Sequence, residues 1–150
     1  MRVVLQRVSD ACVHIDGKKH AAIEQGVLIL LGIEDSDTNE DADWLASKIS
    51  GLRIFNDKAG KMNLSVHEVK GNYLVISQFT LHASTKKGNR PSYIRAARPE
   101  TAIPLYEYFI DTLAKVSGRL VLSGVFGADM QVQLINDGPV TIIIDTKNKA

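Results

Sequence analysis

Hydroxyl and amide side chains gather in the stretch Ser-Gln-Phe-Thr-Leu, residues 77–81, directly after a run of strand-forming residues. Polar groups at the end of a buried strand are placed to face a cleft. A nucleophilic role for Ser77 or Thr80 needs a base within hydrogen-bond reach, for example His82, and a third group that orients this base. Because the chain has no Gly-x-Ser-x-Gly elbow, a serine-hydrolase triad is not favoured. The alternative is that these hydroxyls only satisfy backbone groups.

A loop over residues 82–98 follows this stretch, and its basic part is residues 86–98. Between Val69 and Pro99 there is no Asp or Glu, and the six basic residues there are Lys70, Lys86, Lys87, Arg90, Arg95 and Arg98. Local positive charge suits contacts with phosphates, and Tyr93 among the basic residues could stack on a nucleobase. The formal net charge of +1 gives no global attraction to nucleic acid, so any such site is local. A solvated loop whose charges pair elsewhere is the alternative.

Two further stretches contain glycine or proline where backbone geometry matters. Gly124 and Gly127 flank Phe126 and allow close approach of the backbone to an aromatic shelf, although a plain turn with a core Phe fits equally well. Residues 136–139, Asn-Asp-Gly-Pro, interrupt strand-forming residues and predict a tight hairpin turn. Pro139 removes one donor from a strand ladder and frees backbone groups nearby.

The pattern predicts neither a metal site nor a cofactor site. The four histidines and the single cysteine show no ligand spacing, and no Gly-rich phosphate loop occurs. Cys12 cannot form an internal disulfide, which fits a reducing compartment. The N-terminus shows no signal-peptide pattern, and the longest apolar run, residues 27–31, is too short to span a membrane. We therefore expect a cytoplasmic protein.

The elements that position these stretches are expected to form one compact α+β domain, residues 1–150, with mostly antiparallel strands and two helices. The content of 45% hydrophobic and 23% charged residues is typical of a globular domain. Apolar residues at helical spacing predict one helix that ends at Gly51 and another that begins near Pro99 and ends at Gly118. Asp16-Gly17 predicts a hairpin turn. Strands are expected at residues 3–8, 11–15, 18–23, 26–33, 52–55, 72–81, 120–123, 130–135 and 140–145.

The combination of Ser-Gln-Phe-Thr-Leu at 77–81 with Asn-Asp-Gly-Pro-Val-Thr at 136–141 resembles the two signature motifs of D-aminoacyl-tRNA deacylases of the bacterial and eukaryotic type. Further landmarks occur in the expected order along the whole chain, at residues 5–8, 60–64, 88–92 and 126–130. Ser84 stands where many members carry Asp. The resemblance implies a compact β-barrel-like fold with helices packed outside, a homodimer, and no cofactor.

The resemblance also implies the reaction, which is hydrolysis of the ester bond between a D-amino acid, or glycine, and the 3′-terminal adenosine of tRNA. It implies that Gly138-Pro139 has a cis bond and reaches across the dimer interface into the partner's pocket. There its main-chain groups leave no room for an L side chain, so selection works by exclusion. Lys86, Lys87, Arg90 and Arg95 are the candidates for contacts with the tRNA backbone.

Each remaining motif residue has an expected role. Main-chain N–H groups near Phe79 and Thr80 are expected to bind the ester carbonyl as it gains negative charge. The candidates for positioning the ribose are Ser77 and Gln78, those for cradling the terminal adenine are Phe126 and Met130, and Arg7 is the candidate for supporting the pocket.

Three alternatives stay open. Thr80 resembles a residue once favoured as the nucleophile, but no base is evident, so water assisted by the tRNA 2′-hydroxyl ranks above it. A related deacylase type that clears L-alanine departs from both signature motifs. A non-catalytic tRNA-binding module that uses residues 86–98 would bind tRNA in a salt-dependent way without hydrolysis.

Overall fold

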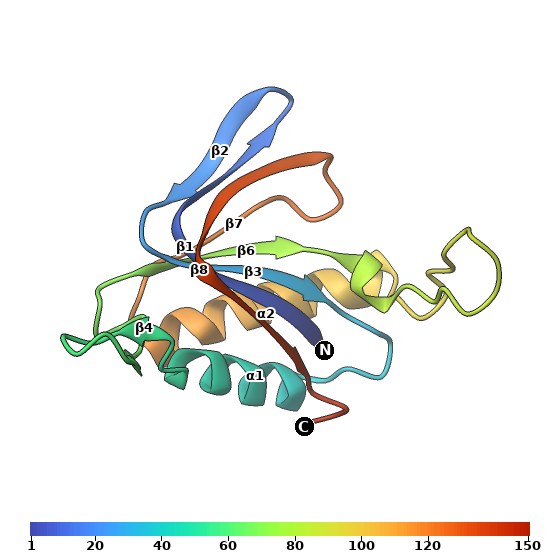
Figure 1. Ribbon diagram of the computed structural model, residues 1–150. Coiled ribbons are helices and arrows are strands. Elements are labelled where there is room, and N and C mark those ends of the chain that lie inside the picture. Colours follow the sequence, from blue (N-terminus) through green and yellow to red (C-terminus); the bar gives the residue numbers. More distant parts are fainter.

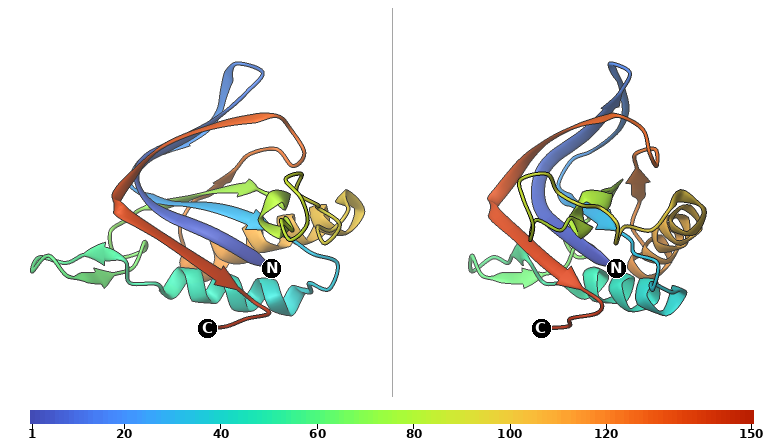
Figure 2. Two further views of the ribbon diagram at one scale, coloured as in Figure 1. Left: turned by 45° about the vertical axis from the view of Figure 1, so that its right-hand side comes forward. Right: turned by 90° about the vertical axis from the view of Figure 1, so that its right-hand side faces the viewer.

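The computed structural model describes all 150 residues, and a six-stranded sheet forms its centre (Figure 1). The long strand β1 (Arg2–Ile15) pairs antiparallel with β2 (Lys18–Ile23), β3 (Gly26–Gly32) and β8 (Met130–Asp145). On its other side β3 pairs in parallel with β6 (Asn72–Ser77), which pairs in parallel with β7 (Val121–Ser123). The strands β4 (Phe55–Asn56) and β5 (Met62–Leu64) form a separate antiparallel hairpin. The sheet curls into a nearly closed, barrel-like shape (Figure 2), which confirms the predicted α+β, mostly antiparallel fold.

Two helices, α1 (Asn39–Gly51) and α2 (Pro99–Ser117), cover one side of the sheet (Figure 1). The buried face of α1 consists of Ala42, Leu45, Ala46 and Ile49, as their spacing predicts, and Thr38 with Asp41 forms its capping box. Gly118 ends α2 in the left-handed conformation with a φ of 64°. Both predicted helices are therefore confirmed, including their ends. Neither helix carries an apolar stretch of the length that a bilayer crossing requires.

The hydrophobic core has two parts, one on each face of the sheet. The larger part lies between the sheet and the two helices, and the smaller part lies inside the curl of the strands. Both faces of β3 are therefore covered, and six of its seven residues are buried. This double burial explains the continuous aliphatic run in that stretch.

The predicted hairpin at residues 136–139 is wrong. The chain runs on as the single strand β8, because both of its halves pair with β1 and not with each other: Asn136 lies opposite Val8, and Thr141 lies opposite Gln6. The four residues between Asn136 and Thr141 bulge out opposite the single residue Arg7. Residues 3–8 and 11–15, predicted as two strands, are likewise one strand that carries this irregularity.

Two other predicted strands are too long. The strand predicted over residues 72–81 ends at Ser77, and the chain turns at Gln78 into the short 3-10 helix η1 (Phe79–His82). The strand predicted over residues 52–55 survives only as β4, whereas β5 was not predicted. Short edge pairings of this kind depend on their neighbours more than on local residue preference.

Candidate functional site

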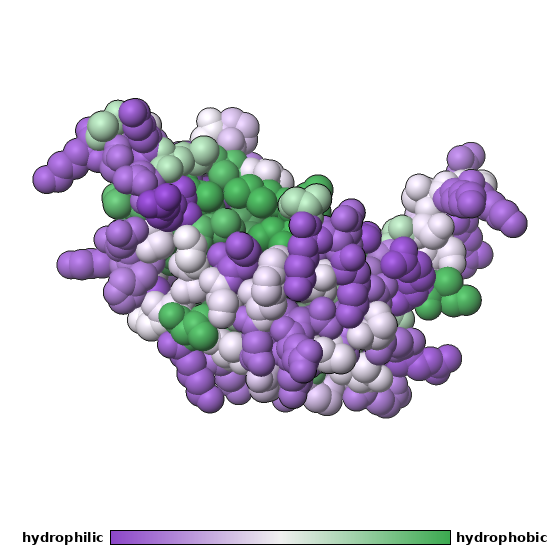
Figure 3. All heavy atoms as spheres, turned by 90° about the horizontal axis from the view of Figure 1, so that it is seen from below, coloured by the Kyte–Doolittle hydropathy of each residue, from purple (hydrophilic) through white to green (hydrophobic).

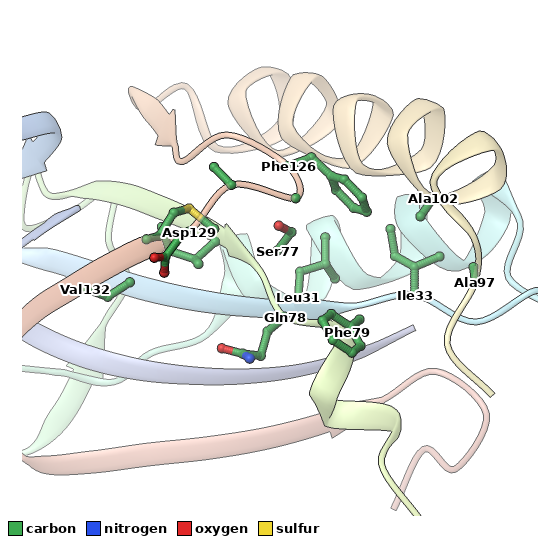
Figure 4. Close-up of a pocket in the computed structure, with 14 residues that line it drawn as sticks. Leu31, Ile33, Ser77, Gln78, Phe79, Ala97, Ala102, Phe126, Asp129 and Val132 are labelled. Carbon is green, nitrogen blue, oxygen red and sulfur yellow. The ribbon is translucent and has the colours of Figure 1, made fainter. Parts of the chain in front are cut away.

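A pocket of about 290 Å³ opens where β3 and β6 end beside the beginning of α2 (Figure 4). One wall is formed by Ser77, Gln78 and Phe79 at the end of β6. The opposite wall includes Phe126, from the segment that leads into β8, and Met130, the first residue of β8. The structure thus brings together five of the residues that the sequence singled out, although they come from two stretches about 50 residues apart in the chain.

The end of β6 is held in place by direct contact with β3. The Gln78 N–H donates a hydrogen bond to the Leu31 carbonyl, at 2.8 Å, after which the backbone turns into η1. Gly32 makes this close approach possible, because a Cβ there would lie 3.0 Å from the Gln78 oxygen and 3.0 Å from Leu81 Cβ. The missing side chain at Gly32 therefore allows η1 to lie this close to β3.

Side chains alternate along this turn. The Ser77 and Gln78 side chains point in opposite directions (Figure 4), and both residues line the pocket. The Gln78 amide donates a hydrogen bond to the Thr80 hydroxyl at 2.5 Å. Thr80 itself does not line the pocket, and no base forms a hydrogen bond with it. His82 is buried, neither of its ring nitrogens has a hydrogen-bond partner, and Glu34 lies 3.8 Å from its Nδ1. The structure therefore assembles no Ser–His or Thr–His pair.

The opposite wall rests on α2. The Phe126 ring packs edge-on against Tyr106, with 5.7 Å between the ring centroids. The Tyr106 hydroxyl donates to the Val75 carbonyl at 3.2 Å, and burial raises the pKa of this phenol. A Cβ at Gly124 would overlap the Met130 sulfur, so this glycine makes room for the methionine side chain. Phe126 and Met130 are thus fixed by packing and not by polar contacts.

Gly138 and Pro139 do not line this pocket. They form the exposed corner of β8, defined here as residues 137–140, with Gly138 at a φ of 137° and a cis Gly138–Pro139 bond. In both views of Figure 2 the corner lies away from η1. Arg7, whose side chain is 8% exposed, holds the corner from within: its Nε donates to the Asp137 carbonyl at 2.9 Å and its Nη1 to the Ile54 carbonyl at 2.8 Å. Arg7 therefore supports the corner and not the chain's own pocket.

The basic loop projects from the body of the molecule between η1 and α2 (Figure 1). Reciprocal backbone hydrogen bonds of 2.8 and 2.9 Å join Ser84 and Ser92 and close its tip. Three of the four predicted phosphate-binding side chains, Lys86, Lys87 and Arg90, stand exposed on this tip. The fourth, Arg95, is also exposed but donates to Glu34 at 3.1 Å.

Several pocket residues escaped the sequence reasoning. Asp129 is the only charged residue that lines the pocket, and the landmark at residues 126–130 was the one signal for it. Leu31 lies near the end of β3 and Ile33 directly follows that strand, whereas Ala97 and Ala102 flank the beginning of α2. Nothing in a local pattern distinguishes these apolar wall residues from ordinary core residues.

Comparison with known proteins places the chain in a family. The family model described as D-Tyr-tRNA(Tyr) deacylase matches residues 4–145. D-aminoacyl-tRNA deacylases of Flavobacterium johnsoniae and Bacteroides fragilis are 59% and 64% identical, each over 149 residues and 99% of both chains. Among solved structures, a c-Myc DNA unwinding element binding protein matches with a TM-score of 0.90 at 40% identity, covering 97% of this chain and 98% of its own. A probable eukaryotic D-amino acid tRNA deacylase shares the fold, with a TM-score of 0.83 at 17% identity over 95% of this chain and 97% of its own. The chain belongs to the D-Tyr-tRNA(Tyr) deacylase family.

Proposed function

We propose that this protein hydrolyses the ester bond between a D-amino acid and the 3′-terminal adenosine of tRNA, and that it accepts glycyl-tRNA as well. The observation that carries the proposal is the pocket in which Ser77, Gln78, Phe79, Phe126 and Met130 meet. Its volume of about 290 Å³ lies just below the usual range for ligand pockets, which suits a single nucleoside. Membership of the deacylase family supports the same reaction.

The reaction in this proposal relies on the backbone and on the substrate. The first N–H groups of a helix have no acceptor inside that helix, so those of Phe79 and Thr80 at the beginning of η1 are suited to stabilise the ester oxygen. Water attacks the carbonyl carbon with help from the tRNA 2′-hydroxyl. The Thr80 hydroxyl accepts from the Gln78 amide, and no base lies beside it to remove its proton. These contacts support attack by water over attack by Thr80.

Chirality is read by the corner of β8 in the partner subunit. The corner is exposed, does not line the pocket of the same chain and is held by a hydrogen bond from Arg7. A backbone group that acts in the pocket of another subunit needs these three properties. In the partner's pocket its main-chain groups leave no room for an L side chain. Glycine and D-amino acids avoid the clash, so selection works by exclusion.

The homodimer that this mechanism needs has a suitable surface. β8 pairs only with β1, so the other edge of β8 is free. Ile143 of β8 is 69% exposed. Seen from the side of α1, the surface shows a contiguous apolar patch (Figure 3). A groove there is lined by Val4, Trp44, Leu52 and Ile142. Patches of this kind mark protein interfaces, and a two-fold axis would give both subunits the same contact.

This dimer is tested by Ile143→Glu, with Met62→Glu as a control at a 55% exposed site on β5. We expect sedimentation velocity to show monomers for Ile143→Glu only, because the new carboxylate would be buried without a partner. Deacylation should fall with the dimer fraction. A monomeric Ile143→Glu variant with full activity and full D-selectivity would refute the cross-subunit filter.

One assay tests the function. The protein is incubated with D-tyrosyl-, L-tyrosyl- and L-alanyl-tRNA, and release of the free amino acid is followed. We expect rapid release from D-tyrosyl-tRNA alone. Release from L-alanyl-tRNA would indicate the related L-alanine-clearing type, and salt-dependent tRNA binding without any release would indicate a binding module.

A further inference from the structure

Two exposed aromatic rings at the mouth of the pocket have no role in the reaction described above. Phe79 is 53% exposed and Tyr93 is 39% exposed, although large apolar side chains usually avoid water. Their ring centroids lie 5.1 Å apart at an interplanar angle of 78°, an edge-to-face contact. Phe79 belongs to η1 and Tyr93 to the basic loop, so the ring pair joins these two segments.

The backbone that carries Tyr93 is fixed. The reciprocal hydrogen bonds between Ser84 and Ser92 directly precede Tyr93, and the Ala96 N–H donates a hydrogen bond to the Tyr93 carbonyl at 3.0 Å. The Ala97 N–H then donates to the Ile33 carbonyl at 2.9 Å, which ties the loop to the end of β3. Tyr93 therefore stands at the anchored base of the loop and presents its ring in a defined place.

The surroundings of the ring pair favour RNA over protein as its occupant. The exposed charged side chains of the loop are all cations, and Glu34, two residues after the end of β3, already pairs with Arg95. Lysine is depleted in the cores of protein interfaces, whereas aromatic rings beside cations are typical of single-stranded nucleic-acid sites. Phe79 also lines the pocket proposed for the terminal adenosine. A nucleotide that precedes this adenosine has to leave by the same mouth.

We propose that the rings of Phe79 and Tyr93 form a stacking platform for the nucleobase immediately before the terminal adenosine of the tRNA 3′ strand. This inference rests on the proposed function, because it assumes that the adenosine occupies the pocket. The contact needs only a π-face, so the platform binds every tRNA in the same way and carries no information about its identity. It adds affinity for the strand without touching the ester.

The kinetic test compares two substrates, D-tyrosyl-tRNA and 3′-O-D-tyrosyl-adenosine, which lacks the preceding nucleotide. The measured quantity is the ratio of their half-saturation concentrations in single-turnover hydrolysis. Tyr93→Ala should raise the tRNA value relative to the adenosine value about tenfold, the scale of one lost base–aromatic stack. Tyr93→Phe keeps the ring and should change the ratio less than about twofold. Met62→Ala, at an exposed apolar site on β5, is the matched control and should leave the ratio as it is.

Two outcomes would overturn the platform. An equal loss on both substrates would show that Tyr93 only holds Phe79 in place. A Tyr93→Ala variant that sediments as a monomer would show that the rings belong to a protein interface. If the wild type releases tyrosine from neither substrate, the proposed function itself fails.

A binding measurement keeps the platform testable in that case too. A short RNA that ends in the sequence CCA is prepared with 2-aminopurine in place of its last cytosine, and its fluorescence is followed on addition of protein. Stacking on the rings should quench the fluorescence with wild type and with Tyr93→Phe, and not with Tyr93→Ala. Unquenched fluorescence at saturating wild-type protein would refute the inference.

Discussion

The Thr80 hydroxyl accepts a hydrogen bond from the Gln78 amide and has no base beside it. We therefore expect Thr80→Ala to keep deacylation of D-tyrosyl-tRNA within about tenfold of wild type, since one positioned hydrogen bond contributes on the order of 1 kcal/mol. Single-turnover kinetics measures this directly. A fall to the uncatalysed rate would restore Thr80 as the nucleophile.

We expect Arg7 to affect the selectivity for D-tyrosyl-tRNA over L-tyrosyl-tRNA more than the rate of hydrolysis. Arg7→Met would leave the buried Ile54 carbonyl and the partly buried Asp137 carbonyl without their charged donor, at a cost of about 1–3 kcal/mol for the buried group. We expect a lower unfolding free energy in urea and a smaller ratio of D-tyrosyl-tRNA to L-tyrosyl-tRNA cleavage, because the corner of β8 is no longer held. Arg53→Met removes an exposed arginine nearby and serves as the control. An unchanged D-to-L ratio in a destabilised Arg7→Met protein would confine Arg7 to a structural role.

Among the secondary-structure elements, the junction of β3 with η1 is the most sensitive to a small change. Gly32→Ala would place a methyl group 3.0 Å from the Gln78 oxygen and 3.1 Å from His82 Cδ2, so η1 has to move away from β3. A shift of about 1 Å in a positioned catalytic group costs on the order of 100-fold in rate. The few tenths of an ångström that the methyl group requires predict a smaller loss, about threefold to tenfold, in the single-turnover rate constant for D-tyrosyl-tRNA.

Gly51→Ala is the matched control for this change. A Cβ at Gly51, the last residue of α1, meets nothing within 4 Å, so the rate should stay as it is. Equal rates for Gly32→Ala and wild type would show that η1 tolerates displacement and that its position is not set by Gly32.

The same elements show how far a sequence can specify this fold. Both helices and the hairpin turn at Asp16-Gly17 follow from local signals: apolar spacing, a glycine at each helix end, and two residues with positive φ. The turn at residues 136–139 has an equally strong local signal, yet it forms no hairpin. Long-range pairing decides here, because β1 offers a partner to both halves of β8. A local pattern carries no information about a strand that is more than a hundred residues away.

The site residues likewise divide into those that local motifs predict and those whose role depends on long-range contacts. Ser77, Gln78, Phe79, Phe126 and Met130 were found through motifs, and the structure places them in one pocket. The apolar walls contributed by Leu31, Ala97 and Ala102 were missed, because their role depends only on where β3 and α2 end. The separation between Gly138 and the pocket was expected solely from the resemblance, since no spacing rule assigns a residue to a neighbouring subunit.

In the molecule as a whole, both chain ends meet in one polar cluster. The Met1 ammonium group pairs with the buried Asp37 and donates to the Thr146 hydroxyl at 2.7 Å. Lys147 lies 2.9 Å from Asp41, at the beginning of α1. Burial alone would raise the pKa of Asp41, but hydrogen bonds from Lys147, from the Thr38 backbone and from Thr146 outweigh it and lower this pKa to about 2.

This cluster predicts an acid-sensitive part of the stability. Because the folded-state pKa of Asp41 lies below its unfolded value of 3.8, the stabilisation is complete above about pH 4 and is lost as the pH falls toward 2. Asp41→Asn should therefore lower the unfolding free energy by about 1–2 kcal/mol at pH 7 and by much less near pH 2. Urea unfolding at both pH values measures the difference. An equal deficit at pH 7 and pH 2 would contradict the ionic origin.

The pairing of β1 with β8 has a consequence for the synthesis of the protein. Arg2 binds Asp145, which lies 143 positions further along the chain. The corner of β8, which Arg7 holds, is likewise synthesised near the end of translation. The first strand therefore leaves the ribosome long before its main partner exists. Contacts of such sequence separation slow folding and leave strand edges unpaired in the meantime. A nascent chain stalled before β8 would present β1 with one free edge, and this is the stage at which a chaperone has the most to protect.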